Sequence, residues 1–194
     1  MYQLSSYTLR ELTVRSPRVY ARRPAVGWVG SDSHSYADFG LLCIRFADQL
    51  RAAGLTNGDR IVLLAENRPE WGVAYMAITA AGMVVVPVLA DFSPEQIANI
   101  LKHADSSAVV VSDKLRPKLP ASCPKTFRLE DIPPLLDQDS QAKELEAELE
   151  QCFSPVAEDS MAAIIYTSGT TGNSKGVMLS HKNLVWDAWA TRSI

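Results

Sequence analysis

The chain has 194 residues, of which 47% are hydrophobic and 21% charged, and its formal net charge is −3. This length allows one good core or two subdomains, and the composition is that of an ordinary globular protein. A slightly negative chain has no overall attraction for nucleic acid, so we expect no nucleic-acid partner. Three widely spaced cysteines without a CxxC pattern argue against a disulfide framework or a zinc site and favour a reducing compartment.

The N-terminal segment is rich in arginine, with five arginines against the single acid Glu11 in residues 1–23. An organellar transit peptide has this composition. We favour a surface helix with an exit loop, because apolar side chains are present to dock it. Those side chains are Leu9, Leu12 and Val19.

A helix is predicted after Ser35, which begins a capping-box-like sequence. Its apolar residues recur every three or four positions up to Ala53, and Gly54 ends it. A second helix starts near Asn67 and is apolar nearly all round, which indicates burial. A third starts at Ser93, with proline at the first helical position.

Three apolar strands alternate with these helices, at residues 61–65, 84–88 and 108–111. Unbroken apolar strands separated by helices predict right-handed βαβ units and a mostly parallel α/β sheet covered by helices on both faces. No Gly-x-Gly-x-x-Gly pattern follows the first strand, so binding of NAD or FAD is not expected. No run of 18 apolar residues predicts a transmembrane segment.

A proline-rich stretch without periodicity follows from Lys114 to Pro134. Residues 139–152 then predict an acidic helix, with Leu145 and Leu149 as a thin contact stripe. A partner-binding role for this helix is the less favoured alternative to a solvated surface helix.

Residues 166–176 read Tyr-Thr-Ser-Gly-Thr-Thr-Gly-Asn-Ser-Lys-Gly. Glycine lets backbone N–H groups turn toward one point, hydroxyls donate to phosphate oxygens, and Lys175 supplies a compact positive charge. This combination suits a polyphosphate. The alternative is a flexible hairpin turn, but such turns seldom carry so many hydroxyls together with a lysine.

The loop is not a Walker A sequence, because Ser174 stands where the second glycine is required and Gly176 follows Lys175. An apolar run at 161–166 precedes the loop, and Ser180 is a plausible helix cap soon after it. We therefore place the loop between two short strands. A helix dipole then contributes nothing to phosphate binding, which rests on loop N–H groups, hydroxyls and Lys175.

In this strand–loop–strand setting the stretch resembles the phosphate-binding signature of the adenylate-forming (AMP-binding) superfamily. That superfamily includes acyl-CoA synthetases, nonribosomal adenylation domains and luciferases. Its members usually have proline before the lysine, where this chain has Ser174. Residues 67–71 and 81–88 look most like the long-chain fatty acyl-CoA ligase branch. Members are much longer than this chain, so it resembles an N-terminal fragment whose adenine and acyl contacts would lie beyond Ile194.

The resemblance also suggests a division of the chain. Residues 1–34 would be an N-terminal helix and loop, and residues 35–194 an incomplete N-terminal AMP-binding domain. Within that domain we expect a βαβ core at about 58–113, a connection at 114–159 and a phosphate-loop element at 160–194.

The resemblance implies two half-reactions for the whole enzyme. A fatty carboxylate attacks the α-phosphorus of ATP to give acyl-AMP and pyrophosphate, and coenzyme A then displaces AMP. Lys175 would stabilise charge on the pyrophosphate, and Thr167 would help to hold Mg²⁺. The fragment alone is expected to be inactive. The implied ATP phosphate-binding residues are Thr167, Ser168, Gly169, Thr170, Thr171, Gly172, Asn173, Ser174 and Lys175.

Two other functions stay open: activation of an amino or aryl acid by another branch of the superfamily, and phosphate or nucleotide binding without catalysis. We expect a cytoplasmic protein, with peripheral membrane contact left open. Trp186 and Trp189 are expected to pack on further parts of the domain, so the isolated chain would expose apolar surface and self-associate.

We expect ordinary structural roles for the remaining histidine and aromatic residues that stand out in the sequence. His181 is expected to be a surface histidine at a helix start. Trp71, Tyr75 and Met76 are expected to belong to the core and not to an acyl pocket.

Overall fold

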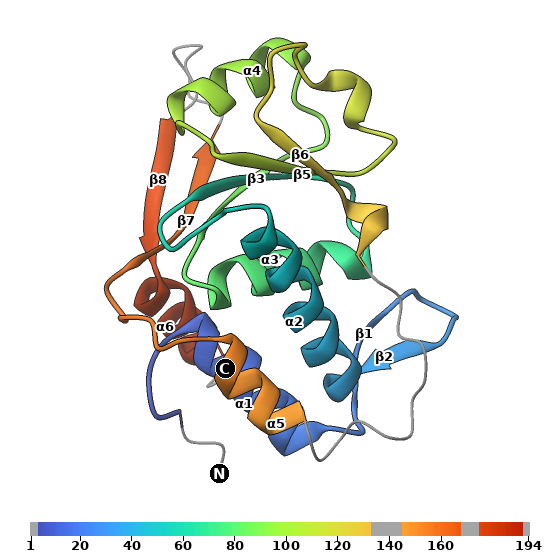
Figure 1. Ribbon diagram of the computed structural model, residues 1–194, viewed down its shortest axis with the longest axis vertical. Coiled ribbons are helices and arrows are strands. Elements are labelled where there is room, and N and C mark those ends of the chain that lie inside the picture. Colours follow the sequence, from blue (N-terminus) through green and yellow to red (C-terminus); the bar gives the residue numbers. More distant parts are fainter. Residues whose placement is uncertain (1–3, 133–144, 168–174, 192–194) are drawn as a thin grey trace.

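The computed structural model describes residues 4–132, 145–167 and 175–191 (Figure 1). Six strands form the main sheet in the order β6-β5-β3-β4-β7-β8. Every neighbouring pair is parallel except β7 and β8, which are antiparallel. The predicted mostly parallel α/β sheet is therefore confirmed. The strands are β3 (Arg60–Leu64), β4 (Val84–Val88), β5 (Ala108–Val111), β6 (Lys125–Arg128), β7 (Met161–Thr167) and β8 (Lys175–Ser180).

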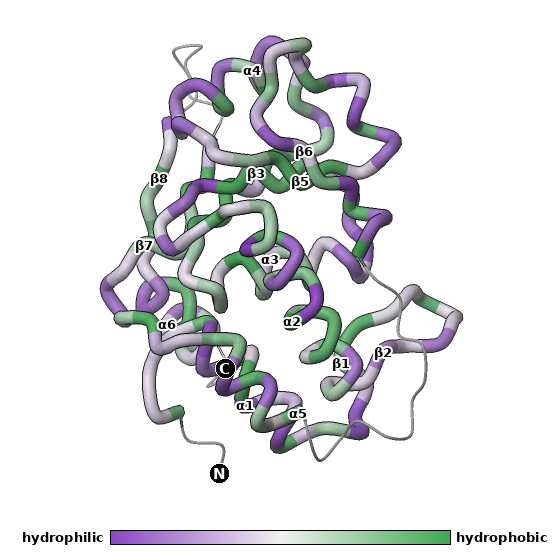
Figure 2. Tube along the Cα trace, in the orientation of Figure 1, coloured by the Kyte–Doolittle hydropathy of each residue, from purple (hydrophilic) through white to green (hydrophobic). Residues whose placement is uncertain are grey.

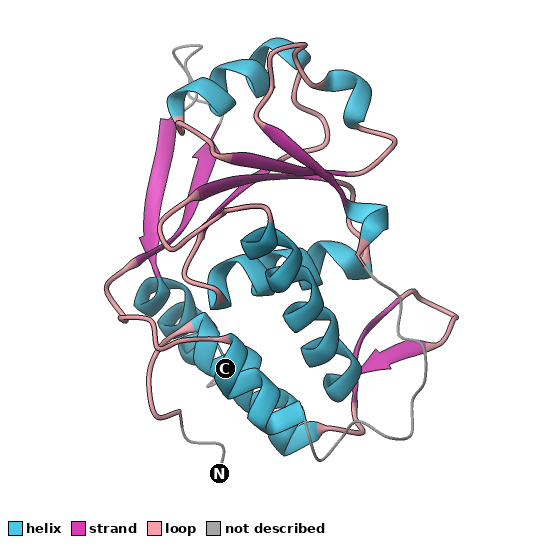
Figure 3. Cartoon of the chain, in the orientation of Figure 1, coloured by secondary structure: helices cyan, strands magenta, loops and turns pink. Residues whose placement is uncertain are grey.

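Helices cover both faces of the sheet (Figure 3). One face packs against α2 (Tyr36–Ala52) and α3 (Pro69–Ala80), and the other against α4 (Pro94–His103). Strand β3 shows why two layers are needed. Ile61 and Leu63 point into the first core and Val62 and Leu64 into the second, because successive side chains of a strand alternate. Figure 2 shows the resulting hydrophobic strands and the more hydrophilic outer turns.

The helix starts follow from short-range capping. Ser35 accepts from the backbone N–H of Asp38, whose carboxylate accepts from Ser35 in return, and this completes a capping box. Ser93 and Gln96 repeat the arrangement at α4. Gly54, just after α2, has φ +89, which a side chain would disfavour. These three local predictions are confirmed.

The proline-rich stretch contains one strand that the sequence did not reveal. Strand β6 pairs in parallel with β5, and it lies between two short 3₁₀ helices, η1 (Arg116–Lys118) and η2 (Leu129–Asp131). The expectation of an irregular connection is wrong here. Its four residues, Lys-Thr-Phe-Arg, carry a charge at each end, as suits an edge strand.

Four further elements complete the layer that holds α2 and α3. The bounds are α1 (Leu9–Tyr20), β1 (Pro24–Gly27), β2 (Ser33–Ser35) and α5 (Leu145–Cys152). The side chains of Leu145 and Leu149 are buried on the core, so the predicted contact stripe of α5 is confirmed. The part of the acidic helix predicted before Leu145 lies outside the described residues.

The predicted N-terminal helix is present as α1 and packs against α2 and α3. Leu9 and Val14 are buried, and the Arg10 guanidinium donates to the carbonyl of Phe153 at 2.9 Å and forms an ion pair with Glu150. Pairing with the acidic segment near residue 150 thus accounts for one of the N-terminal arginines.

Candidate phosphate-binding site

The predicted phosphate loop is carried by the β7–β8 hairpin at one end of the sheet (Figure 1). Thr167 is the last residue of β7, Lys175 the first of β8, and the two are paired. The strand–loop–strand setting is therefore confirmed at both flanks. Residues 168–174, which include seven of the nine predicted phosphate-binding residues, lie outside the described residues.

The pair of Thr167 and Lys175 stands at the carboxyl edge of the parallel sheet. Strand β7 runs parallel to β4, and β4 to β3, so all three strands end at this edge. Ligands of open α/β sheets bind outside the carboxyl ends of the strands. The two strand ends that flank the loop thus lie at the edge where this architecture binds ligands.

A cavity of about 470 Å³ lies beside this hairpin. Trp71 lines it and stacks on Tyr75, with ring centroids 5.2 Å apart. Tyr75 and Met76 are partly buried against the core, as expected. Trp71 also packs against the core, but it lines this cavity as well, which the prediction of a purely core residue did not include. The lining comprises residues 65–67 after β3, Trp71, residues 87–91 at the end of β4, and Ile165 and Tyr166 of β7.

Charges near this edge are largely paired. Glu66 forms an ion pair with Lys114 at 3.4 Å, and the neighbouring Ser112 hydroxyl is the main cause that holds the pKa of Glu66 below its usual value. Arg68 pairs with Glu70 at 2.9 Å. The positive charges of Lys114 and Arg68 are thus already paired with carboxylates.

Lys175 differs from those cations. Its side chain is exposed, and it forms no ion pair with any residue that the structure describes. The Thr167 side chain is exposed on the opposing strand end. A hydroxyl and an ammonium group therefore stand at the two ends of the loop, which is the arrangement expected of a phosphate site.

Sequence reasoning missed the residue that contacts the loop end of the hairpin. A hydrogen bond of 2.6 Å joins Nδ1 of His103, at the end of α4, to the hydroxyl oxygen of Tyr166. The two residues are 63 positions apart, so no local pattern reveals the contact. The signal that was present is the tyrosine at the end of an otherwise aliphatic strand, since a buried tyrosine hydroxyl usually has a partner.

His181 is not a surface residue, so that expectation is wrong. It begins α6 (His181–Thr191), yet its side chain is fully buried. The backbone N–H of Leu9 donates to its Nδ1 at 3.2 Å, and burial lowers the pKa of the imidazole to about 4. The residue thus links α1 to α6.

A family model described as AMP-binding enzyme matches residues 14–193. The chain belongs to this family. It is 34% identical over 170 residues to the long-chain-fatty-acid–CoA ligase FadD15 of Mycobacterium tuberculosis, with 78% of this chain and 28% of that protein covered. It is 31% identical over 170 residues to feruloyl-CoA synthase of an Amycolatopsis species, with 81% and 30% covered.

The solved structure of a Mycobacterium tuberculosis fatty acyl CoA synthetase has the same fold. The TM-score is 0.76 at 23% identity, over 95% of this chain and 37% of that one. The chain therefore spans about a third of the length of these relatives. The fold is that of the N-terminal domain of adenylate-forming enzymes.

Proposed function

We propose that the whole protein is an ATP-dependent acid–thiol ligase that activates a carboxylate as acyl-AMP and then transfers the acyl group to coenzyme A. In the first step a carboxylate oxygen attacks the α-phosphorus, and pyrophosphate leaves with the bonding electrons. In the second step the coenzyme A thiolate attacks the acyl carbon and AMP leaves. The division into a lead-in at 1–34 and an incomplete AMP-binding domain at 35–194 belongs to the same proposal.

The pair of Thr167 and Lys175 carries this proposal. Negative charge grows on the leaving pyrophosphate, and a fixed cation beside it lowers the barrier. Lys175 is held at a strand end, next to a loop sequence of hydroxyls and glycines, and it has no competing carboxylate in the part of the chain that is described. Ser168–Ser174 would supply the remaining phosphate donors.

Mg²⁺ fits the same site. It is a hard cation that takes oxygen ligands and usually keeps several waters while binding substrate phosphates. Thr167 offers one exposed hydroxyl oxygen at the strand end, which is a suitable single protein ligand. Bound there, the metal ion would neutralise phosphate charge.

For the acid, we propose a long-chain fatty acid. The identity to the long-chain ligase and the apolar lining that Val88, Leu89 and Ile165 give the cavity beside the hairpin support it. The runner-up is an aryl acid. The feruloyl-CoA synthase relative favours that alternative, as does Trp71, whose ring could stack on an aromatic acid.

The test is pyrophosphate exchange into ATP by the whole protein, driven by a panel of fatty, aryl and amino acids. We expect fatty acids to drive exchange most strongly. Lys175→Ala should lower the exchange rate about a hundred-fold, as loss of one charge-stabilising donor does. Lys182→Ala, a change at an exposed lysine of α6, is the matched control and should have no effect. Equal rates for the two variants would remove Lys175 from the mechanism.

The same assay on residues 1–194 separates catalysis from mere binding. We expect no exchange from this chain, since it spans about a third of the relatives. Binding of ATP without exchange by the whole protein would instead support a non-catalytic phosphate-binding module.

A cytoplasmic location with peripheral membrane contact is also a proposal. No helix among the described residues is long and apolar enough to cross a bilayer. The β1–β2 hairpin, however, exposes Trp28 and Val29 between its two strands, and the exposed Arg22 and Arg23 directly precede its first strand. Exposed apolar residues and arginines on one short segment suit an anionic lipid surface. Trp28→Ser should weaken co-sedimentation with phosphatidylserine vesicles, and unchanged co-sedimentation would contradict this role.

A further inference from the structure

The contact between α4 and the loop end of the hairpin has no part in the function proposed so far. Tyr166 is buried on the α4 side of the sheet, in the same cluster as Ile97 and Ile100 of α4. His103 meets it edge-on, with ring centroids 5.7 Å apart and an interplanar angle of 85°. The hydrogen bond of 2.6 Å between Nδ1 and the phenol oxygen adds a directional link.

Tyr166 is also held from the other side. It pairs with Gly176 across the two strands, and its ring lies over that glycine. A Cβ added at Gly176 would stand 3.2 Å from Cζ of Tyr166 and 3.0 Å from Cγ2 of Ile164, which is closer than ordinary contact. The glycine therefore lets the tyrosine ring cross β8 and reach α4.

Position in the strand connects this contact to the phosphate loop. Thr167 follows Tyr166 directly, and Lys175 precedes Gly176. Successive side chains of a strand point to opposite faces, so an anchor at Tyr166 fixes the backbone from which Thr167 projects on the other face. The same anchor restrains Lys175, because Tyr166 is packed on the residue beside it.

We propose that His103 is a positioning residue of the adenylation site. Its hydrogen bond to Tyr166 holds the end of the β7–β8 hairpin against α4, and so fixes the spacing of the Thr167 hydroxyl and the Lys175 ammonium group. This inference rests on the proposed function. His103 acts through Tyr166 and touches no substrate.

A structural measurement tests the link without any catalysis. Hydrogen exchange followed by mass spectrometry on the 194-residue chain should show faster exchange in peptides covering 161–167 and 175–180 for His103→Ala and for Tyr166→Phe. One neutral hydrogen bond corresponds to about a five-fold change in local opening. Peptides covering β3 should not change. Lys102→Ala, at the exposed neighbour of His103 on the same helix, is the control. Unchanged exchange in β7 and β8 would overturn the proposal.

Kinetics of the whole protein test the consequence. His103→Ala and Tyr166→Phe should each raise KM for ATP and lower kcat, by about five-fold in kcat/KM, because displaced Thr167 and Lys175 weaken both ATP binding and charge stabilisation in the transition state. The double variant should be no worse than either single variant, since both remove one bond. His103→Asn places an amide group near the position of Nδ1 and should restore most of the affinity.

The outcomes separate the two proposals. If the variants gave less active protein but an unchanged KM for ATP, His103 would support folding only, and the positioning role would be overturned. Additive effects in the double variant would show that the hydrogen bond does not act as one unit, and would also overturn the proposal. If the unaltered whole protein exchanged no pyrophosphate, the proposed function and the positioning role of His103 in adenylation would both fail. The hydrogen-exchange result would then decide the structural link alone.

Discussion

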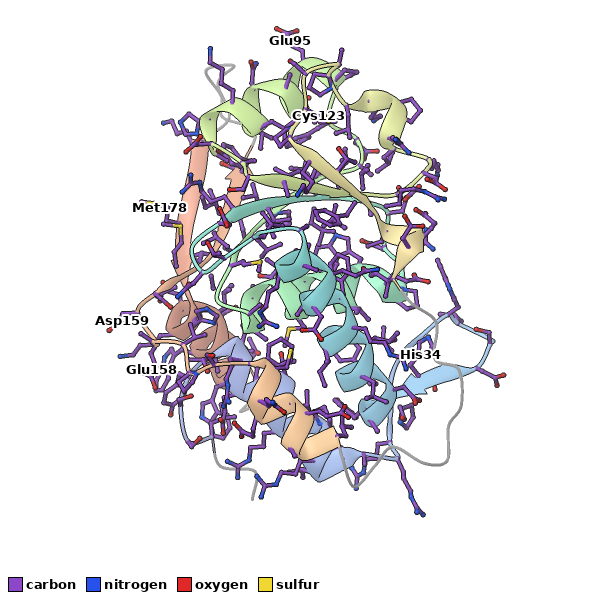
Figure 4. All side chains as sticks on the ribbon, in the orientation of Figure 1. His34, Glu95, Cys123, Glu158, Asp159 and Met178 are labelled. Carbon is purple, nitrogen blue, oxygen red and sulfur yellow. The ribbon has the colours of Figure 1, made fainter. Side chains whose placement is uncertain are left out.

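The centre and the end of the sheet differ in how completely they are covered. In β3, β4 and β5 nearly every side chain is buried, with helices on both faces. In β8, Val177 is 48% exposed and Met178 68% exposed, although they point to opposite faces, and Figure 4 shows Met178 on the outer side of the strand. The centre thus supplies stability, while the end presents a polar loop and tolerates exposed apolar groups.

Phe46→Ala is the strongest test of this contrast. The side chain is fully buried on α2, so the cavity should lower the free energy of unfolding by about 3–5 kcal/mol. Urea titration followed by circular dichroism measures the change. Met178→Ala should cost less than about 0.5 kcal/mol in the same titration. Similar losses for the two variants would abolish the distinction between centre and end.

The buried His181 should make stability fall in acid. Its pKa is about 4 in the folded chain against 6.5 in an unfolded one, so both states are neutral above pH 6.5. As the pH falls toward 4, the unfolded state takes up the proton on His181 and the folded state largely does not. This protonation stabilises the unfolded state, so the free energy of unfolding falls by about 3 kcal/mol in total. Below pH 4 both states are protonated and this loss stops.

His181→Asn is the matching variant, because the Asn amide oxygen can still accept from the N–H of Leu9. The difference in unfolding free energy between the two proteins, measured by urea titration at pH 7 and at pH 4.5, isolates the histidine from other titrating groups. Parallel pH profiles would show that the imidazole titrates normally.

Gly176→Ala should have a smaller effect, at the end of the sheet. The added methyl group meets Tyr166 and Ile164, which must shift, at a cost of about 1–3 kcal/mol. Near-ultraviolet circular dichroism of the tyrosine environment and urea titration would detect it. Gly72→Ala is the control, because its nearest atom outside its own helix lies at 3.8 Å.

The smallest effect on stability belongs to Met178→Lys. An exposed edge strand with apolar side chains favours pairing with another copy, and a lysine on such an edge opposes it. We expect sedimentation velocity at high concentration to show self-association of the 194-residue chain and its loss in the variant, with stability within about 0.5 kcal/mol. Trp186 on α6 is also 54% exposed. A strictly monomeric chain would refute the expected association.

What could be predicted from the sequence depended on the range of the interactions. Short stretches of sequence determine the helix caps at Ser35 and Ser93 and the buried strands, and all of these were predicted correctly. Strand β6 was missed because four residues with charged ends resemble a loop, and only pairing with β5 makes them a strand. His181 was misplaced because its partner, the backbone of Leu9, lies 172 positions away.

The same distinction between short-range and long-range interactions applies to the candidate site. The composition of the loop and its two flanking strands were readable because they are contiguous in the chain. The link from His103 to Tyr166 and the cavity contact of Trp71 arise only when separate βαβ units are stacked.

The strand order also has a consequence for the order of folding. Strands β3, β4 and β5 are consecutive in the chain, and each pairs with a near neighbour, whereas β7 must return to β4 over the whole connection through β5 and β6. Contacts between distant segments form more slowly, because closing the intervening loop costs entropy. We therefore expect the central strands to assemble first and the hairpin to dock last. A newly made chain would then acquire its proposed phosphate site only after its core is complete.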